Sequence, residues 1–393
     1  MTFDFDTPVD IANAHASKHD FMRTVCEVDA DDGIPMWVAD MDFAAPDVVR
    51  QAVANEIERG FLGYYGLPNS WREAQCSWLA TRHGWQAKTE WLTPVPGIMF
   101  ALATVIQRFS EPGDSVAIFS PVYHEFAKTI IANDRNVHNQ PMIEEQGRYR
   151  MDVEGLGRDM PGNTRIVVLC SPQNPGGRVW TREELREVAE FCIERDLILI
   201  SDEIHGDLVY SGSKFIPAAV AAPEVSDRLV TLCGATKAFN IAGAKIGTSV
   251  ASNPKIKRQI DAGLKASGTG SPNRLGMAAV QAALESGAPW LDALIPYLEN
   301  NRDHFAKRIT RAIPGVRAMH LEATFLAWTD FSATGLTYED VWRRITKKAR
   351  IGVSPGPQFG PGGENRIRFN IATHYARLNE ALDRLEDAFS DFR

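Results

Sequence analysis

The fold of this chain is constrained most by an alternation of helical and strand-like patterns that runs from Pro46 to about Ser286. Short, continuous apolar runs of the kind found in buried strands recur between helical stretches. Strands that alternate with helices predict a mostly parallel sheet with helices on both of its faces, which is an α/β fold. The runs that we expect to be strands lie at 115–119, 165–170, 197–201, 228–233 and 246–251.

Three helices of this alternation have recognisable ends. Pro46 opens an apolar-periodic stretch. Ser70 and Glu73 have the spacing of a capping box, in which each side chain satisfies a free backbone N–H group of the other residue. Thr181 and Glu184 repeat this spacing. The signals predict helices over about 46–60, 70–84 and 181–195.

The pattern changes after Pro289. A long amphipathic segment from Trp290 to about Ile313 leads into two or three strand-like pieces and a last helix over Tyr375–Phe392. The first part of the chain has weak periodicity, and we expect it to form an arm that also supplies a piece of the C-terminal domain. The expected division is an N-terminal arm at 1–45, a large domain at 46–288 and a smaller α+β domain at 289–393.

Composition and charge narrow the classes of function. Apolar residues make up 44% and charged residues 23% of the chain, which is ordinary for a globular protein and excludes a disordered or fibrous one. The formal net charge is −8 and no basic stripe is present, so we expect neither a nucleic acid nor an anionic membrane as partner. The longest apolar stretches fall far short of the roughly 20 residues that a membrane span needs. The acidic N-terminus lacks the apolar core of a signal peptide.

The cysteines and histidines indicate neither a disulfide framework nor a metal site. The five cysteines are scattered and odd in number, which is typical of reduced thiols in a cytoplasmic protein. His15 and His19 have i, i+4 spacing, but no carboxylate motif accompanies them, so no metal site is expected.

Polar residues follow three of the predicted strands at the point where each strand ends. Ser171–Gly177 (SPQNPGG), Ser201–His205 (SDEIH) and Gly234–Lys237 (GATK) hold these positions. Ligands of open α/β sheets bind at the carboxyl ends of the strands, so an Asn, an Asp and a Lys should meet in one crevice. This set suits a pyridine aldehyde cofactor, which needs an amine for a Schiff base, a carboxylate for the ring nitrogen and a donor for the ring hydroxyl.

The strings SPQNPGG, SDEIH and ATKAFNIAGAKIG resemble the motif series of the fold-type I pyridoxal-phosphate (PLP) enzymes, the class I and II aminotransferase superfamily. The resemblance runs from Pro35–Phe43 (PMWVADMDF) to Asn365–Asn370 (NRIRFN). MWVADMDF, SPQNPGG and SDEIH together are typical of its cystathionine β-lyase-like MalY/PatB branch of C–S lyases. The resemblance implies the PLP-dependent transferase fold of type I, with a large mixed, mostly parallel sheet domain and a smaller α+β C-terminal domain.

The resemblance also implies how the ring of PLP is held. Lys237 carries PLP as a Schiff base and later removes the substrate Cα proton, and both tasks need a lysine with a depressed pKa. Asp202 pairs with the ring nitrogen, although a strand-end Asp also caps helices. Asn174 binds the ring 3′-oxygen and contacts the substrate. Tyr123 stacks on the ring and takes part in catalysis, with an ordinary core tyrosine as the alternative.

The phosphate of PLP needs N–H donors and positive charge. Gly97 precedes an apolar helix, so the backbone N–H groups of Ile98 and Met99 should point at an anion from the helix N-terminus. Thr236 can add a hydroxyl. Lys245 stands where many relatives carry a phosphate-binding arginine, and a lysine offers a point charge without the bidentate fork.

The substrate contacts implied by the resemblance come from both ends of the chain. Arg368 matches the arginine that binds the substrate carboxylate, and planar bidentate geometry is the reason for an arginine there. Arg366 lies on the same strand face two residues earlier and is the alternative. Trp37 and Asp40 are expected to line the mouth of the site, although both also suit a role without substrate contact.

Tyr64 is expected to act between subunits. It matches a residue that reaches the phosphate of the neighbouring subunit in relatives, which implies a homodimer with shared active sites. A packed tyrosine in an aromatic loop is the alternative.

The position three residues after Asp202 bears on the reaction. Aminotransferases of this fold usually have a tyrosine there that contacts the ring oxygen, whereas this chain has His205, which we expect at the cofactor. The resemblance therefore implies β-elimination on L-cystathionine or a related cysteine S-conjugate, with pyruvate, ammonia and a thiol as products. An aminotransferase on the same fold is the alternative. A regulator that binds a protein partner is a third hypothesis, and the intact Lys237 argues against it.

Overall fold

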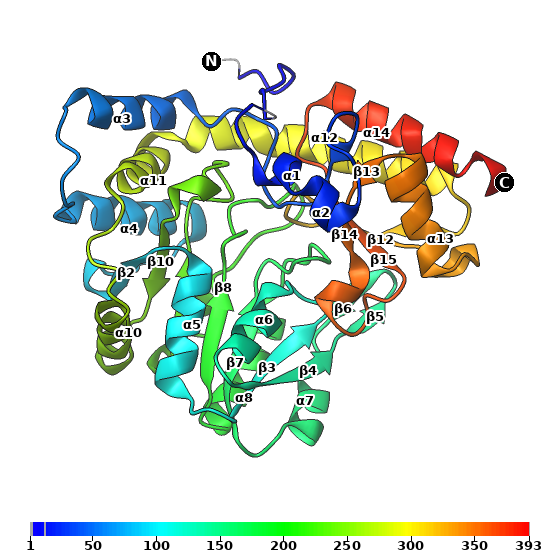
Figure 1. Ribbon diagram of the computed structural model, residues 1–393. Helices are drawn as coiled ribbons and strands as arrows, with labels where there is room; N and C mark the ends of the chain where they lie inside the picture. Colours follow the sequence, from blue (N-terminus) through cyan, green and yellow to red (C-terminus); the bar gives the residue numbers. More distant parts are fainter. Residues whose placement is uncertain (1–2, 12, 393) are drawn as a thin grey trace.

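The computed structural model describes residues 3–11 and 13–392, and its largest element is a seven-stranded sheet (Figure 1). β10 is antiparallel to both of its neighbours, and all other pairs are parallel. The sheet is therefore mixed and mostly parallel, as the alternation predicts. In sheet order, the strands are β2 (Leu92–Val95), β10 (Gly247–Val250), β9 (Leu229–Cys233), β8 (Ile198–Asp202), β7 (Thr164–Cys170), β3 (Ser115–Ser120) and β4 (Asn136–Pro141).

All five apolar runs that the sequence marks as strands are strands of this sheet, namely β3, β7, β8, β9 and β10. β2 and β4 were not expected. β4 lies at an edge of the sheet and has mostly polar or partly exposed residues (NVHNQP), so it lacks the continuous apolar signal of a buried strand. β2 holds the other edge and contains Pro94, which lowers its strand signal.

Helices cover both faces of the sheet because successive strand residues point to opposite sides. Val116 and Ile118 of β3 belong to one apolar core, and Ala117 and Phe119 belong to the other. The first core contains residues of α5 (Ile98–Phe109), α6 (Glu125–Ala132) and α10 (Pro254–Ala266). The second contains residues of α7 (Val153–Asp159), α8 (Arg182–Glu194) and α9 (Ala218–Ala221).

One of the two expected capping boxes is present. At α8, the Glu184 N–H donates to Thr181 Oγ1 at 3.2 Å, and the Thr181 N–H donates to Glu184 Oε2 at 2.8 Å. At α4 (Asn69–His83) the prediction is wrong, because the extended Pro68 takes the N-cap position and the helix starts before Ser70. α3 (Asp47–Glu58) precedes it, as expected.

The last third of the chain forms a separate four-stranded antiparallel sheet. Its order is β11 (Arg317–Ala318), β12 (Leu326–Asp330), β15 (Arg366–Asn370) and β14 (Ser354–Pro355). α12 (Ala288–Ala312), α13 (Tyr338–Arg343) and α14 (Tyr375–Ala388) accompany this sheet, whereas α11 (Arg274–Ser286) packs against α3 and α4. α12 and α14 match the two helices that the sequence predicts here, and they run side by side (Figure 1).

The N-terminal segment joins this last third rather than the large sheet. After α1 (Ser17–Asp20) and α2 (Met22–Cys26), β1 (Ile34–Pro35) pairs in parallel with β13 (Ile351–Gly352). A small hairpin of β5 (Ile143–Glu145) and β6 (Arg148–Arg150) completes the strands. Among the described residues, no helix combines the length and the hydropathy of a membrane span.

Candidate active site

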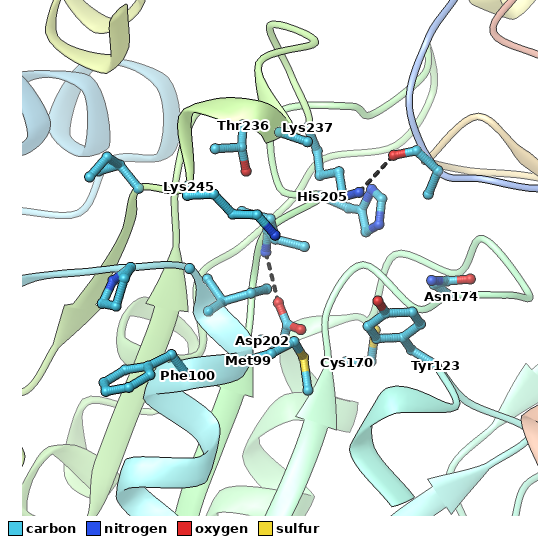
Figure 2. Close-up of a pocket in the computed structure, with 17 residues that line it drawn as sticks. Met99, Phe100, Tyr123, Cys170, Asn174, Asp202, His205, Thr236, Lys237 and Lys245 are labelled. Carbon is cyan, nitrogen blue, oxygen red and sulfur yellow. Dashed lines mark hydrogen bonds between the residues drawn. The ribbon is translucent and has the colours of Figure 1, made fainter. Parts of the chain in front are cut away.

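A cavity of about 220 Å³ lies where β7, β8 and β9 end, beside the N-terminus of α5 (Figure 2). Parallel strands end at the same edge of a sheet, so their terminal residues gather there. Every residue that the sequence assigns to the cofactor lines this cavity except Tyr64. The lining residues among them are Gly97, Ile98, Met99, Tyr123, Asn174, Asp202, His205, Thr236, Lys237 and Lys245.

Lys237 reaches into this cavity from the loop after β9. Its Nζ donates to the carbonyl oxygen of Ala39 at 2.6 Å (Figure 2). Enclosure lowers the pKa of Lys237 to about 8, and the positive charges of Arg368 and Lys245 act in the same direction, against Asp40 and Asp202. A substantial fraction of the amine is therefore neutral near physiological pH, as carbonyl attack and proton removal require.

Asp202 is the last residue of β8 and is 4% exposed. Its Oδ1 accepts the N–H of Ile204 at 3.1 Å, and no described residue forms an ion pair with it. Burial raises the pKa of Asp202 to about 7, partly offset by the Ile204 N–H and by Lys237. A buried carboxyl group without a cation is costly, so the site favours a positively charged partner in the cavity.

Arg368 lies on β15, behind the cavity lining, and is 3% exposed. It donates to Asn174 Oδ1 at 3.0 Å, to the Trp37 carbonyl oxygen at 3.0 Å and to Ser354 Oγ at 3.1 Å. Burial lowers the pKa of Arg368 to about 10, and its Nε has no hydrogen-bond partner in the described structure. The guanidinium group has no carboxylate partner among the described residues, so an anion is the missing counterpart.

Arg366, the alternative to Arg368, has a different environment. It forms ion pairs with Glu144 and, at 3.7 Å, with Asp330. Its charge is neutralised within the chain. Of the two arginines, only Arg368 is free to compensate a bound anion.

The N-terminus of α5 lies at one end of the cavity. Gly97 has a φ of 102°, a conformation that favours glycine, and turns the chain into α5 so that Ile98 and Met99 line the cavity. The first N–H groups of a helix lack intrahelical acceptors and attract negative charge. Thr236 and Lys245 lie on the same lining, and no ion pair engages Lys245 in the described part of the chain.

Tyr123 and His205 are both uncharged in this environment. Burial raises the pKa of Tyr123 to about 12. Burial, followed by the nearby charges of Lys237 and Arg368, lowers the pKa of His205 to about 3. The Nδ1 atom of His205 is buried and finds no partner among the residues described. A neutral imidazole with an unused polar atom at the cavity is consistent with contact to a bound polar group.

Besides Arg368, three residues predicted from the sequence do not line the cavity. Tyr64 is 92% exposed and lies on another part of the surface. Trp37 and Asp40 were expected at the mouth, but both side chains turn toward Lys18. Trp37 Nε1 donates to the Lys18 carbonyl oxygen at 2.8 Å, and Asp40 Oδ1 lies 2.6 Å from Lys18 Nζ.

Ala39, which lies between Trp37 and Asp40, lines the cavity instead and contacts Lys237 through its carbonyl oxygen. Neither Ala39 nor Lys18 is expected at the site from the sequence. A backbone carbonyl is common to all residue types, so no residue pattern marks it. The burial of Lys18 depends on contacts with residues far along the chain.

The residues at the cavity fit PLP. The neutral fraction of the Lys237 amine suits its aldehyde, and the uncompensated Asp202 carboxyl suits its ring nitrogen. The helix N-terminus and Lys245 suit its phosphate. Within the described chain, no group of three or more His, Cys, Asp or Glu side chains is arranged to hold a metal ion.

Comparison with known proteins identifies the family. Residues 32–385 match the family model described as aminotransferase class I and II. The chain is 36% identical over 360 residues to the cystathionine beta-lyase PatB of Bacillus subtilis, covering 91% of this chain and 93% of that protein. It is 28% identical to the protein MalY of Escherichia coli, covering 100% of each.

Solved structures agree with this assignment. Cystalysin from Treponema denticola, which contains a pyridoxal 5′-phosphate cofactor, superposes with a TM-score of 0.95 at 30% identity and full coverage of both chains. The PLP-bound C–S lyase from Staphylococcus hominis superposes with a TM-score of 0.90 at 29% identity, covering 99% of this chain and 98% of that one. The chain belongs to the aminotransferase class I and II family, in the branch of fold-type I PLP-dependent enzymes that includes the cystathionine β-lyases.

Proposed function

We propose that the protein is a PLP-dependent C–S lyase of the cystathionine β-lyase type. In this reaction L-cystathionine and water give homocysteine, pyruvate and ammonia, and related cysteine S-conjugates give the corresponding thiol. One observation carries the proposal. The Lys237 amine, whose pKa is lowered to about 8, lies at one cavity together with the buried side chains of Asp202 and Arg368, which have no ion-pair partner among the described residues. Relatives named cystathionine beta-lyase support the reaction type.

The proposed mechanism gives each of these residues a task. Bound PLP withdraws electrons from the substrate Cα and thereby makes its proton acidic. Asp202 accepts a hydrogen bond from the ring nitrogen and keeps it protonated. Arg368 and Asn174 bind the substrate carboxylate and fix the Cα position. Lys237 removes the Cα proton, after which the Cβ–S bond breaks and the thiolate leaves with the bonding electrons and takes up a proton.

The remaining cofactor residues orient the bound group. Tyr123 stacks on the ring, and His205 contacts its polar edge with a neutral imidazole. The N–H groups that follow Gly97, at Ile98 and Met99, bind the phosphate. The Thr236 hydroxyl and the Lys245 ammonium group contribute to the same end. The Trp37 carbonyl oxygen accepts a hydrogen bond from Arg368, and the negative charge of Asp40 favours the protonated form of Lys237.

Elimination is favoured over transamination by His205, which replaces the tyrosine that aminotransferases of this fold usually carry. Product analysis with L-cystathionine, without any keto-acid acceptor, tests this choice. Equal amounts of pyruvate, ammonia and homocysteine are expected. Slow turnover that becomes fast amino transfer when a keto acid is added would instead identify an aminotransferase.

Arg368→Met tests the proposed carboxylate site. We expect kcat/KM for cystathionine to fall by about 100-fold or more, mainly through KM, because losing one partner of a desolvated ion pair costs about 2–5 kcal/mol. Arg366→Met is the matched control, since Arg366 is already paired with Glu144 and Asp330. Steady-state kinetics that show an equal loss in both variants would contradict the assignment.

We also propose a homodimer in which Tyr64 reaches the phosphate in the neighbouring subunit. Its 92% exposure supports this role, as does the exposure of Ile57, Phe61 and Leu62 in the same segment. Several exposed large apolar side chains in one short segment suit a protein interface. The further proposals are the division into an arm at 1–45, a large domain at 46–288 and a small domain at 289–393, and a cytoplasmic location, which the free thiols of all five cysteines support.

Subunit mixing tests the shared site. Tyr64→Ala is expected to weaken PLP binding about tenfold, and Lys237→Ala is expected to be inactive. When the two variants are unfolded and refolded together, each mixed dimer has one site with both residues intact. At a PLP concentration too low to fill the Tyr64→Ala homodimer, about one quarter of wild-type activity should return, because random pairing yields about half mixed dimers and each of them has one intact site. A mixture no more active than Tyr64→Ala alone would place Tyr64 in its own subunit's site or outside the site.

A further inference from the structure

The segment from Trp37 to Phe43, here called the strap, touches the site at two points. The Ala39 carbonyl oxygen accepts a hydrogen bond from Lys237 Nζ at 2.6 Å. The Trp37 carbonyl oxygen accepts one from Arg368 at 3.0 Å. The strap thus contacts the proposed base and the proposed carboxylate-binding arginine through its backbone alone. The position of the strap therefore sets where Lys237 and Arg368 find these carbonyl oxygens as hydrogen-bond acceptors.

Amide side chains hold the strap on the side of the protein body. Asn370 Nδ2 donates to the carbonyl oxygens of Val38 at 2.6 Å and Asp40 at 2.5 Å. Asn240 donates to the carbonyl oxygens of Met41 and Phe43 at 3.0 and 2.8 Å. These bonds are between neutral groups, and none of them reaches the side chains of Asp40 and Asp42.

Lys18 also holds the strap, and its Nζ shares the Asp40 carbonyl oxygen with Asn370. Lys18 lies on α1, does not line the cavity and is 1% exposed. Its Nζ lies 2.6 Å from Asp40 Oδ1 and 2.7 Å from Asp42 Oδ1, and it donates to the Asp40 carbonyl oxygen at 3.1 Å. The Trp37 indole donates to the Lys18 carbonyl oxygen at 2.8 Å. One buried cation therefore contacts three residues of the strap.

Lys18 is charged in this position. Burial alone lowers the pKa of Lys18, but Asp42 and Asp40 more than offset it, so the pKa lies above its ordinary value and the side chain is a cation. A buried charge is retained only where paired partners have good geometry. An apolar residue would fill the same space without fixing two carboxylates. The lysine is therefore suited to setting the position of the strap rather than only filling the core.

We propose that Lys18 is a positioning residue for Lys237. By binding Asp40 and Asp42 it holds the Ala39 carbonyl oxygen where it accepts one N–H of the Lys237 amine. That hydrogen bond orients the nitrogen whenever the amine is free, so that its lone pair can act on the substrate Cα proton. The inference rests on the proposed role of Lys237 as the base. It assigns a catalytic consequence to a residue of the N-terminal arm.

Lys18→Met in the holoenzyme is the first test, because methionine keeps an unbranched side chain only one heavy atom shorter and removes the charge. We expect kcat for cystathionine to fall by about 10- to 100-fold while KM changes by less than about threefold, as expected for a misplaced reacting group. The isotope effect on kcat with Cα-deuterated cystathionine should rise, because proton removal becomes slower. A loss of packing alone would not raise it.

A second readout does not depend on turnover. After PLP is removed, the apoenzyme regains its visible absorption when PLP is added back, and this step needs the free Lys237 amine. We expect Lys18→Met to slow this recovery about tenfold. Wild-type kcat and wild-type recovery in a folded Lys18→Met variant would overturn the inference. If the wild type itself neither binds PLP nor cleaves cystathionine, the proposed function fails instead.

Lys347→Met is the matched control. Lys347 also ties the N-terminal arm to the body, with Nζ 2.7 Å from the Glu27 carbonyl oxygen and 3.0 Å from Glu27 Oε2, but it does not contact the strap. This variant should behave as the wild type in both assays. An equal loss in Lys347→Met and Lys18→Met would show that arm attachment, rather than the contact of Lys18 with the strap, is responsible, and would overturn the inference.

Asp42→Asn keeps the test decisive if Lys18→Met does not fold. The substitution preserves shape and one acceptor oxygen but removes one of the two charges paired with Lys18. We expect the same changes as for Lys18→Met at a smaller size, about three- to tenfold in kcat and in the rate of PLP recovery. Wild-type values for both quantities in this variant would overturn the inference without the lysine variant.

Discussion

Lys237→Ala is expected to lose cystathionine cleavage by about 10³-fold or more, because the general base contributes about 10²- to 10⁴-fold and the covalent attachment of PLP is lost as well. The structure supports this expectation through the enclosed amine, whose pKa is lowered to about 8 beside Asp202. Alanine leaves the cavity in place but removes the nitrogen. Pyruvate formation, followed in a coupled assay at saturating PLP, measures the loss.

Borohydride reduction adds a direct chemical readout of the same variant. In the wild type, reduction should fix PLP irreversibly to a peptide that contains Lys237, as mass spectrometry of the digest would detect. The variant should release all of its PLP. Lys255→Ala is a suitable control, since Lys255 is an exposed residue of α10 outside the cavity. Full pyruvate formation by Lys237→Ala would remove the basis for the proposed mechanism.

Asp202→Asn is expected to have opposite effects on activity and on stability. Turnover should fall by about 10²- to 10³-fold, because an amide no longer holds the ring nitrogen of PLP protonated and a fixed charge of the site is lost. The apoenzyme should become more stable at pH 8, because the substitution removes a buried carboxylate that no described cation pairs with.

The sign of the pH dependence follows from the direction of the pKa shift. Burial raises the pKa of Asp202 from 3.8 to about 7 in the fold. A carboxyl group with a raised pKa stabilises the fold fully below its unfolded value, near pH 4, and this contribution is lost as the pH rises through about 7. The advantage of Asp202→Asn in free energy of unfolding should therefore grow from pH 5 to pH 8 and reach about 2–4 kcal/mol.

Denaturant unfolding of both apoenzymes at several pH values measures this difference. Glu203, whose pKa burial raises to about 8, is present in both proteins, so the part of its contribution that comes from burial cancels, whereas the part due to the charge of Asp202 does not. A difference that stays constant with pH would mean that Asp202 does not titrate in this range. Retained turnover in Asp202→Asn would mean that the Asp202 carboxylate of the wild type does not support the ring nitrogen.

The sequence alone determined five of the seven strands of the main sheet and the centre of the candidate site. Five apolar runs became β3 and β7 to β10, because a strand buried on both faces needs apolar residues throughout. Asn174, Asp202 and Lys237 lie at the carboxyl ends of three of these strands, so the parallel arrangement brings them to one cavity without further information. Local chemistry and strand polarity were sufficient for this part.

Only the tertiary structure decided features that depend on distant partners. Arg366 and Arg368 are equivalent as a pattern, and they differ because Glu144 and Asp330 neutralise the first while Asn174 contacts the second. The same holds for Lys18. No sequence pattern distinguishes this lysine from the others, and its role depends on its burial between two carboxylates of the strap. Such roles follow from which charges find a partner in the fold, and a one-dimensional pattern does not contain those distances.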